Sequence, residues 1–144
     1  MATSEFTVRL GDWGSLQHDA QFVRKAVFVE EQGIPAELEW DANDVNCLHA
    51  VAYNTTGEPV GTGRLLPDGH VGRMAVLASV RGNGVGAEIL RKLMEQAKTR
   101  GDGIVMLNAQ QSAEAFYRKE GFVQVGEIFE EAGIPHIAMQ KNLL

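Results

Sequence analysis

The spacing of apolar and polar residues along the chain predicts strands in alternation with helices. Apolar and polar residues alternate over 6–10, as in a half-buried strand, and apolar residues recur at steps of four over 85–100, as in an amphipathic helix. The predicted elements, in chain order, are a strand at 6–10, a helix at 15–32, strands at 48–53, 59–66 and 71–77, a helix at 85–100, a strand at 104–108, a helix at 112–120, and strands at 122–125 and 136–140. This order predicts one α/β domain that spans residues 1–144.

The first helix and the segment after it carry two further expectations. Phe22, Ala26 and Val29 follow helical spacing and are predicted to share the buried face of the helix, which the sequence Gly-Ile-Pro at 33–35 ends. Residues 36–46 show no periodicity, so we expect an acidic loop there. Trp40, within this loop, offers either an aromatic face to a cation or a packing surface.

Composition and charge narrow the class of protein. The chain has 144 residues, a formal net charge of −6 and a single cysteine, Cys47, so no internal disulfide and no zinc site built from cysteine pairs can form. We therefore expect a cytoplasmic protein without a metal. The N-terminus lacks the features of a signal peptide and no apolar run is long enough for a membrane helix. An isoelectric point near 5.2 argues against a nucleic-acid partner.

The charges are distributed unevenly. Residues 26–63 contain seven acidic residues and no Lys or Arg, whereas residues 64–100 contain seven basic residues against three acidic ones. Either both are solvated surfaces, or one half of the molecule suits a cationic ligand and the other an anionic one. Arg64 and Arg73 fall on adjacent predicted strands, where each faces either a cofactor or a salt-bridge partner.

A glycine-rich loop carries the main chemical signal. It reads Arg81-Gly82-Asn83-Gly84-Val85-Gly86-Ala87, follows a predicted strand and opens the helix at 85–100. Glycines let the backbone approach a ligand closely, and the helix N-terminus supplies free N–H groups and positive potential, so the loop predicts an anion site. The alternative is a tight turn that only begins the helix.

Two familiar phosphate loops do not fit this glycine loop (residues 81–87). A P-loop would need Lys and Ser or Thr after the last glycine, where this chain has Ala87-Glu88. A Rossmann fingerprint belongs to the first strand–helix unit and needs an acid after the next strand, which here ends in Asn108. A pyrophosphate site of another type remains.

The glycine loop resembles the acetyl-CoA signature of the GNAT superfamily of N-acetyltransferases, which has the form Arg-x-x-Gly-x-Gly. A second segment, Ala-Phe-Tyr-Arg-Lys-Glu-Gly-Phe at 115–122, is similar to the helix-to-strand signature near the C-terminus of that superfamily. The stretches at 27–32, 61–65 and 131–136 look more specifically like the ElaA-like branch.

This resemblance implies a three-layer fold in which helices flank a mixed, splayed β-sheet, with acetyl-CoA as co-substrate between the strands at 71–77 and 104–108. The backbone of the first strand would pair with the pantetheine arm like an extra strand, and the N–H groups of the loop would hold the pyrophosphate. Gln110 stands where the family often has an Asn. The implied cofactor-binding residues are Met74, Ala75, Val76, Arg81, Gly82, Asn83, Gly84, Val85, Gly86, Ala87, Asn108, Gln110, Phe116 and Tyr117.

The implied reaction is direct attack of a primary amine on the thioester in a ternary complex. Tyr117 would act as the general acid for the departing thiolate, and the Val76 N–H would be the oxyanion donor. Glu31 is the predicted proton acceptor, with His49 and His136 as alternatives.

The resemblance implies a small-molecule or peptide amine as acceptor, and the acidic stretch would suit a cationic one. Dimers are common in the superfamily, which leaves a homodimer open. A non-catalytic acyl-CoA-binding or sensor module on the same fold is the alternative function.

Overall fold

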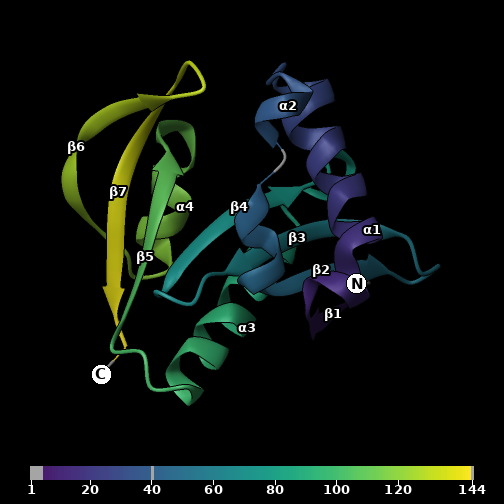
Figure 1. The fold of residues 1–144 in the computed structure, drawn as a ribbon, viewed down its shortest axis with the longest axis horizontal. Coiled ribbons are helices and arrows are strands. Elements are labelled where there is room, and N and C mark those ends of the chain that lie inside the picture. Colours follow the sequence, from purple (N-terminus) through teal and green to yellow (C-terminus); the bar gives the residue numbers. More distant parts are fainter. Residues whose placement is uncertain (1–4, 40, 144) are drawn as a thin grey trace.

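The computed structural model describes residues 5–39 and 41–143, so the predicted role of Trp40 lies outside the described residues. Figure 1 shows a mixed seven-stranded sheet with helices packed against it. The strands are β1 (Phe6–Gly11), β2 (Leu48–Asn54), β3 (Pro59–Leu65), β4 (His70–Val76), β5 (Ile104–Gln110), β6 (Val123–Glu131) and β7 (Ile134–Asn142). The helices are α1 (Trp13–Arg24), the π-helix η1 (Lys25–Glu31), α2 (Ala36–Glu39), the 3₁₀ turns η2 (Ala42–Asn46), η3 (Ala78–Val80) and η4 (Gln111–Ala113), α3 (Val85–Thr99) and α4 (Glu114–Lys119).

The sheet consists of two halves that diverge. The strand order is β1-β2-β3-β4-β5-β7-β6, and β4 with β5 is its parallel pair. These two strands pair only at His70 with Met106 and at Val71 with Leu107, although β4 continues to Val76 and β5 to Gln110. Figure 1 shows β5, β7 and β6 set apart from β1–β4 as a result. The predicted mixed, splayed sheet is confirmed.

A β-bulge in β4 contributes to this divergence. Thr62 of β3 pairs with Ala75 and Arg64 pairs with Gly72, so two residues of β4 lie opposite one residue of β3. Arg73 occupies the bulge with φ of 50°, a left-handed conformation that is unusual for a residue other than glycine. A bulge bends its strand and increases the twist, which turns the end of β4 away from β5.

Helix α3 closes one face of the sheet through the apolar stripe that the sequence predicted. Its buried residues are Val85, Ile89, Leu90, Leu93, Met94 and Ala97. Two glycines of β3 allow this close packing: a Cβ built on Gly61 would lie 2.8 Å from Val85 Cγ1, and one on Gly63 would lie 3.0 Å from Ile89 Cγ2. The helix is thereby fixed against β3, which positions the glycine loop at its N-terminus.

The buried face predicted for the first helix was wrong. Phe22 is 55% exposed, and the buried stripe is Leu16, Ala20, Val23 and Val27, which cover the opposite face of the sheet from α3. Both sets of residues follow helical spacing, so periodicity alone does not distinguish them. The buried set lies next to Arg24, a charged residue that the sequence pattern places at the surface but that is fully buried.

The helix itself also differs from a regular α-helix, because η1 replaces its last turns; Gln32 N–H donates to the Val27 carbonyl, five residues back. The helix ends before Gly33, as predicted.

Three other boundaries differ from the prediction. The acidic segment is not a simple loop, because it contains α2 and η2. Strands β6 and β7 extend further toward each other than the apolar pattern indicates. They meet at Ala132 and Gly133, both at positive φ, which is the geometry of a tight hairpin turn. Among the helices described, none is long and apolar enough to cross a membrane.

Candidate active site

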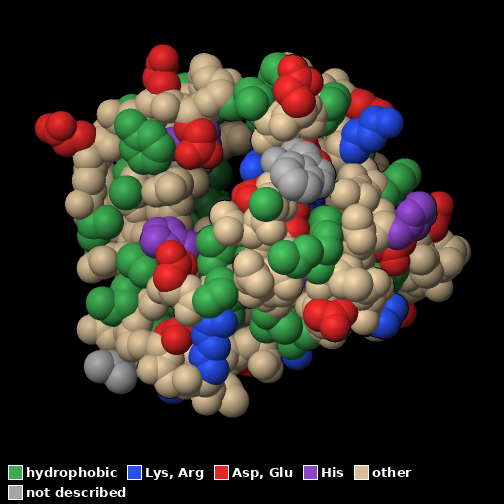
Figure 2. All heavy atoms as spheres, in the orientation of Figure 1, with side chains coloured by type: hydrophobic (Ala, Val, Ile, Leu, Met, Phe, Trp, Pro, Cys, Tyr) green, Lys and Arg blue, Asp and Glu red, His purple; other side chains and the backbone are tan. Residues whose placement is uncertain are grey.

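A cavity of about 940 Å³ lies where the two halves of the sheet separate. One wall comes from η1 and β4 and the other from β5, η4 and α4, with the β6–β7 turn at one end. Figure 2 shows the surface hollowed between the two halves. Several predicted site residues line this cavity: Glu31, Met74, Ala75, Val76, Arg81, Asn108, Gln110 and Tyr117.

The glycine loop lies at the Val76 end of this cavity and has the geometry of an anion site. Gly82 and Gly84 have φ near +86° and +85°, and a Cβ at either position would meet no atom within 4 Å. The loop therefore needs glycine for its backbone conformation. Gly84 caps α3 without a side-chain hydrogen bond, so the N–H groups of the first turn remain available to a ligand.

Arg81 does not extend freely from the glycine loop. Its Nε donates to the Val76 carbonyl at 3.0 Å, and its two terminal nitrogens donate to the carboxylate of Glu31 at 2.5 and 2.6 Å. These bonds hold the pKa of Glu31 below its ordinary value. The pair ties the end of η1 to the end of β4, and it makes the Glu31 carboxylate a weaker proton acceptor than the sequence prediction assumed.

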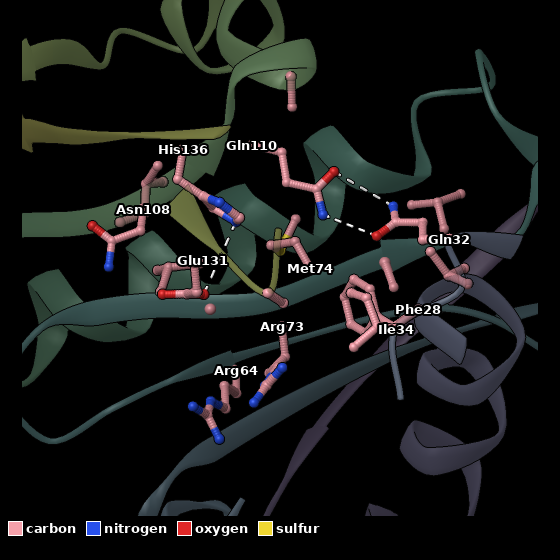
Figure 3. Close-up of a pocket in the computed structure, with 18 of the residues that line it drawn as sticks. Phe28, Gln32, Ile34, Arg64, Arg73, Met74, Asn108, Gln110, Glu131 and His136 are labelled. Carbon is pink, nitrogen blue, oxygen red and sulfur yellow. Dashed lines mark hydrogen bonds and ion pairs between the residues drawn. The ribbon is translucent and has the colours of Figure 1, made fainter. Parts of the chain in front are cut away.

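A second contact crosses the mouth of the cavity beside this ion pair. The Gln110 side-chain amide donates to the Gln32 side-chain oxygen at 3.0 Å, and Figure 3 shows these two side chains facing each other. Gln110 lies at the end of β5 and Gln32 directly after η1. Glu31 at the end of η1 therefore contacts Arg81 after β4, and Gln32 contacts Gln110 of the opposite wall, which the sequence did not indicate.

Tyr117 enters the cavity from α4 as a buried phenol. Its ring packs edge-on against Phe116 at 4.9 Å and Phe122 at 6.0 Å between centroids. Within the part of the chain that the structure describes, its hydroxyl has no hydrogen-bond partner. Burial raises the pKa of Tyr117 to about 12, so the hydroxyl keeps its proton at neutral pH. Phe116, predicted as a cofactor contact, lies beside Gly86 of the glycine loop.

The two histidines considered as bases occupy different environments. His49 is 1% exposed, its Nε2 donates to the Asp44 carbonyl at 2.8 Å, and it does not line the cavity. His136 lines the cavity from β7. Its Nδ1 lies 2.7 Å from the Ile134 carbonyl, which can only accept, so Nδ1 carries a proton, and in the neutral imidazole the lone pair is on Nε2. Figure 3 shows Nε2 directed toward Glu131, 4.0 Å away.

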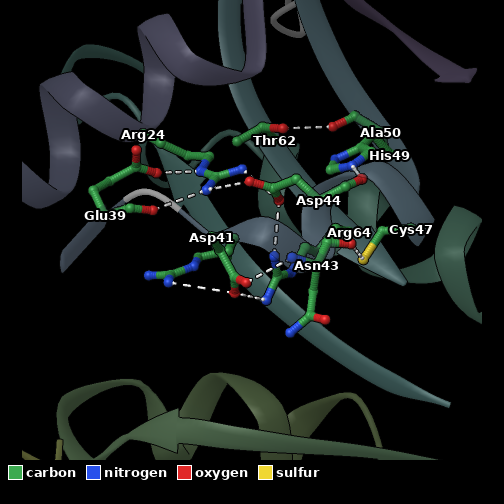
Figure 4. Close-up of polar contacts among 11 residues, drawn as sticks. Arg24, Glu39, Asp41, Asn43, Asp44, Cys47, His49, Ala50, Thr62 and Arg64 are labelled. Atoms are coloured by element: carbon green, nitrogen blue, oxygen red, sulfur yellow. Dashed lines mark hydrogen bonds and ion pairs between the residues drawn. The ribbon is translucent and has the colours of Figure 1, made fainter. Parts of the chain in front are cut away.

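A charged cluster beneath the cavity accounts for much of the acidic stretch. Arg24 donates to both oxygens of Asp44 at 3.0 and 3.1 Å and also to Glu39 (Figure 4). Arg64 donates to Asp44 at 2.8 Å and to Asp41 at 2.7 Å. These carboxylates are neutralised inside the protein, which removes the main argument for a cationic acceptor. Of the two roles that sequence analysis left open for Arg64, the structure shows the salt bridge. Sequence analysis missed Arg24, which lies on a predicted helix and is distant in sequence from its partners.

A helix N-terminus with free N–H groups beside one end of a splayed cleft, with a protonated phenol inside the cleft, fits an acyltransferase that uses an acyl-CoA thioester. The chain belongs to the GNAT family, because the family model described as an acetyltransferase (GNAT) domain matches residues 18–143. Members of this family transfer acyl groups from acyl-CoA and use acetyl-CoA as co-substrate.

Individual relatives agree with this assignment. The uncharacterized N-acetyltransferase YjcF of Bacillus subtilis (strain 168) is 43% identical, over 86% of this chain and 91% of the relative. Protein ElaA of Escherichia coli (strain K12) is 31% identical over 92% and 97%, respectively. The crystal structure of Escherichia coli ElaA superposes with a TM-score of 0.84 at 28% identity, covering 96% of this chain and all of that one. An acyl-CoA N-acyltransferase from Pseudomonas aeruginosa superposes with a TM-score of 0.83 at 28% identity, covering 95% and 99%.

Proposed function

We propose that the protein is an acetyl-CoA-dependent N-acetyltransferase, in which a primary amine attacks the thioester directly in a ternary complex. One observation carries this proposal. The cavity between β4 and β5 is lined by Arg81, the first residue of the glycine loop, and by Tyr117, although residues 82–87 do not line it. This arrangement supports a phosphate site at the N-terminus of α3, beside one end of the cavity, and a proton donor inside it.

The open edge of β4 supports the placement of the pantetheine arm. Met74, Ala75 and Val76 belong to β4 but lie beyond its pairing with β5. Leu77 N–H donates to Val60 of β3, and N–H groups of successive strand residues point in opposite directions. The Val76 N–H therefore points toward the cleft, where it can pair with the arm or with the thioester oxygen. Asn108 and Gln110 face this edge from β5.

The reaction needs two proton transfers. As the amine nitrogen bonds to the acetyl carbon, the carbon–sulfur bond breaks and the electron pair leaves with the sulfur. Tyr117, protonated and without an internal partner, is the proposed donor to that sulfur. The ammonium proton passes, directly or through water, to an acceptor. His136 Nε2 fits this role better than Glu31, because it lies in the cavity wall and its nearest charged neighbour is Glu131 at 4.0 Å, whereas the Glu31 carboxylate is held by Arg81.

Replacing His136 by glutamine is expected to lower kcat by about a hundredfold or more, since general base catalysis commonly contributes about 10²-fold or more. Acetyl-CoA affinity should change little. Steady-state kinetics of thiol release, with a calorimetric titration of acetyl-CoA, measures both. His18→Gln is the matched control at an exposed histidine. If Glu31→Gln reduces kcat by more than His136→Gln does, the base is Glu31, as the sequence predicted.

The proposed function is tested first by calorimetric titration with acetyl-CoA, beside NADH and ATP. We expect binding of acetyl-CoA alone, and about a hundredfold weaker binding by Gly84→Glu, because like charges brought together at a binding site cost several kcal/mol. Gly101→Glu is the matched control: Gly101 lies at the other end of α3, also at positive φ and in open space. If both variants lose acetyl-CoA affinity to the same extent, the loss comes from backbone strain and not from the charge at the glycine loop.

Thiol release with a panel of amines then separates an enzyme from an acyl-CoA-binding module. Binding without release for any amine would favour the module. Failure to bind acetyl-CoA at all would contradict both.

A further inference from the structure

We propose that the acceptor is an amine that also carries an oxyanion, foremost a carboxylate, which binds between Arg73 and the Nε–H of Arg64. This inference rests on the proposed function and adds the chemical class of its second substrate. Figure 3 shows the two arginines side by side beneath the cavity.

The position of these arginines fits an acceptor site. The glycine loop lies beyond the Val76 end of β4, and Gly72 is four residues back along the strand, roughly 13 Å at strand rise. An arm that enters along β4 from the loop therefore reaches the bulge at Arg73 with its far, acyl-bearing end. Arg64 is paired with Gly72 in the sheet, and all three residues line the cavity.

Arg73 has almost no partner of its own. Its one ion pair among the described residues is with Asp41 Oδ2 at 3.7 Å, and that oxygen already accepts from Arg64 at 2.7 Å. The bulge and its positive φ direct this side chain away from regular strand pairing, and about a quarter of it is exposed. A guanidinium in this state still offers several N–H donors in the planar arrangement that matches a carboxylate.

Arg64 supplies a second donor that nothing inside the described chain satisfies. The side chain is 8% exposed, and its two terminal nitrogens bind Asp44 and Asp41. Its Nε is the one buried side-chain polar atom of the described residues without a hydrogen-bond partner. Buried donors are rarely left unpaired, so such a donor in a cavity wall indicates a ligand oxygen. Gly72 lies beside Nε without a side chain, whereas a Cβ at this position would be in van der Waals contact with Nε, 3.7 Å away.

The other charges that face this site do not favour a cation. Asp41, Asp44 and Glu39 are bound by Arg24 and Arg64, and Glu31 is bound by Arg81. Glu131 faces His136 from the opposite wall, and His70 lines the cavity next to Asp68. Burial and the nearby positive charges of Arg24 and Arg64 lower the pKa of Arg73, so this cation is electrostatically destabilised where it stands. A bound oxyanion would offset the loss of hydration on burial and the repulsion by Arg24 and Arg64.

The test compares acceptors that differ only in the oxyanion. Thiol release from acetyl-CoA is measured with phenylalanine, leucine and lysine, each beside its α-carboxamide and its decarboxylated amine, and with O-phosphoethanolamine beside ethanolamine. We expect kcat/KM to be about tenfold to a hundredfold higher for each compound that carries the oxyanion than for its neutral analogue, which is the usual worth of charge-assisted hydrogen bonds. If only O-phosphoethanolamine is preferred over its partner, the proposed oxyanion site stands, and its ligand is a phosphate monoester rather than a carboxylate.

Two variants connect that preference to the proposed residues. Arg73→Gln should reduce the ratio of carboxylate to carboxamide to near one, mainly through KM. Gly72→Ala should reduce it as well, because it places a methyl group before the free Nε in ordinary contact. Arg91→Gln, at an exposed arginine of α3 that pairs with Glu120, should leave the ratio as in the parent protein.

The inference fails if carboxamides and decarboxylated amines react as well as the acids, or if Arg73→Gln lowers all of them equally. Should no amine release thiol, N-acetylphenylalanine and its carboxamide are titrated into the protein in the presence of coenzyme A. Equal or absent binding then contradicts the inference. A protein that binds acetyl-CoA but shows no carboxylate preference overturns only this inference, whereas a protein that does not bind acetyl-CoA overturns the proposed function.

Discussion

Phenylalanine in place of Tyr117 is expected to lower kcat by about a hundredfold or more, with the acetyl-CoA affinity nearly unchanged. General acid catalysis contributes about 10²–10⁴-fold in typical enzymes. The substitution removes only an oxygen that has no partner among the described residues, and the ring contacts with Phe116 and Phe122 persist. Thiol-release kinetics with a saturating amine measures kcat, and calorimetry measures the affinity.

Tyr53 provides the matched control. It is a second buried tyrosine, and its hydroxyl donates to Asp19 at 2.6 Å, away from the cavity. Tyr53→Phe should cost about 1 kcal/mol of unfolding free energy, the usual worth of a hydrogen bond, and should leave kcat as it is. If Tyr53→Phe and Tyr117→Phe lower kcat to a similar extent, the effect at Tyr117 is structural and the proton must come from elsewhere.

The pH dependence offers a further check on Tyr117. A general acid works only while it is protonated, and burial raises the pKa of this phenol from its ordinary value near 10 to about 12. Activity should therefore show no loss attributable to Tyr117 between pH 7 and 10, where an exposed phenol would begin to ionise. A decline of kcat with an apparent pKa near 10, absent from Tyr117→Phe, would show that the hydroxyl is more hydrated than its burial indicates.

The parts of the site that depend on local sequence were predictable. The glycine loop and the amphipathic pattern of α3 are adjacent in the chain, and each follows from a local rule: glycine at positive φ, and apolar residues at steps of four. The splayed sheet came from resemblance to the family. Whether residues 1–144 fold as one domain, whether copies associate, and where the protein resides stay predictions.

The contacts that cross the cleft were not predictable from pattern. Glu31 and Arg81 are 50 residues apart, and Gln32 and Gln110 are 78 apart. Nothing in local hydrophobicity specifies such pairings, because they depend on how η1 leaves α1 and on where the β4 bulge places the loop. The ligand expected for the acidic stretch depended on such distant pairings as well. Its charge suggested a cationic ligand, but its carboxylates face arginines from α1 and β3.

Removing Arg24 should have the largest effect on stability. Its guanidinium is 1% exposed, binds both oxygens of Asp44 and lies over the ring of Trp13 at 5.4 Å. Arg24→Met keeps most of the volume but leaves Asp44 and Glu39 buried with fewer donors. Breaking a buried ion pair in this way typically costs about 3–5 kcal/mol. Urea denaturation measures the loss, and Arg91→Met, at an exposed pair, should change stability by about 1 kcal/mol or less.

A double-mutant cycle separates the buried pair from a simple packing defect. Adding Asp44→Asn to Arg24→Met should cost much less than Asp44→Asn costs alone, because the carboxylate that it removes has already lost one of its two arginines. Additive losses would mean that the two side chains act independently. The cluster also orients the acceptor site, since Asp44 holds Arg64 at 2.8 Å. Arg24→Met protein that remains folded should therefore lose its preference for carboxylate acceptors while it still binds acetyl-CoA at the distant glycine loop.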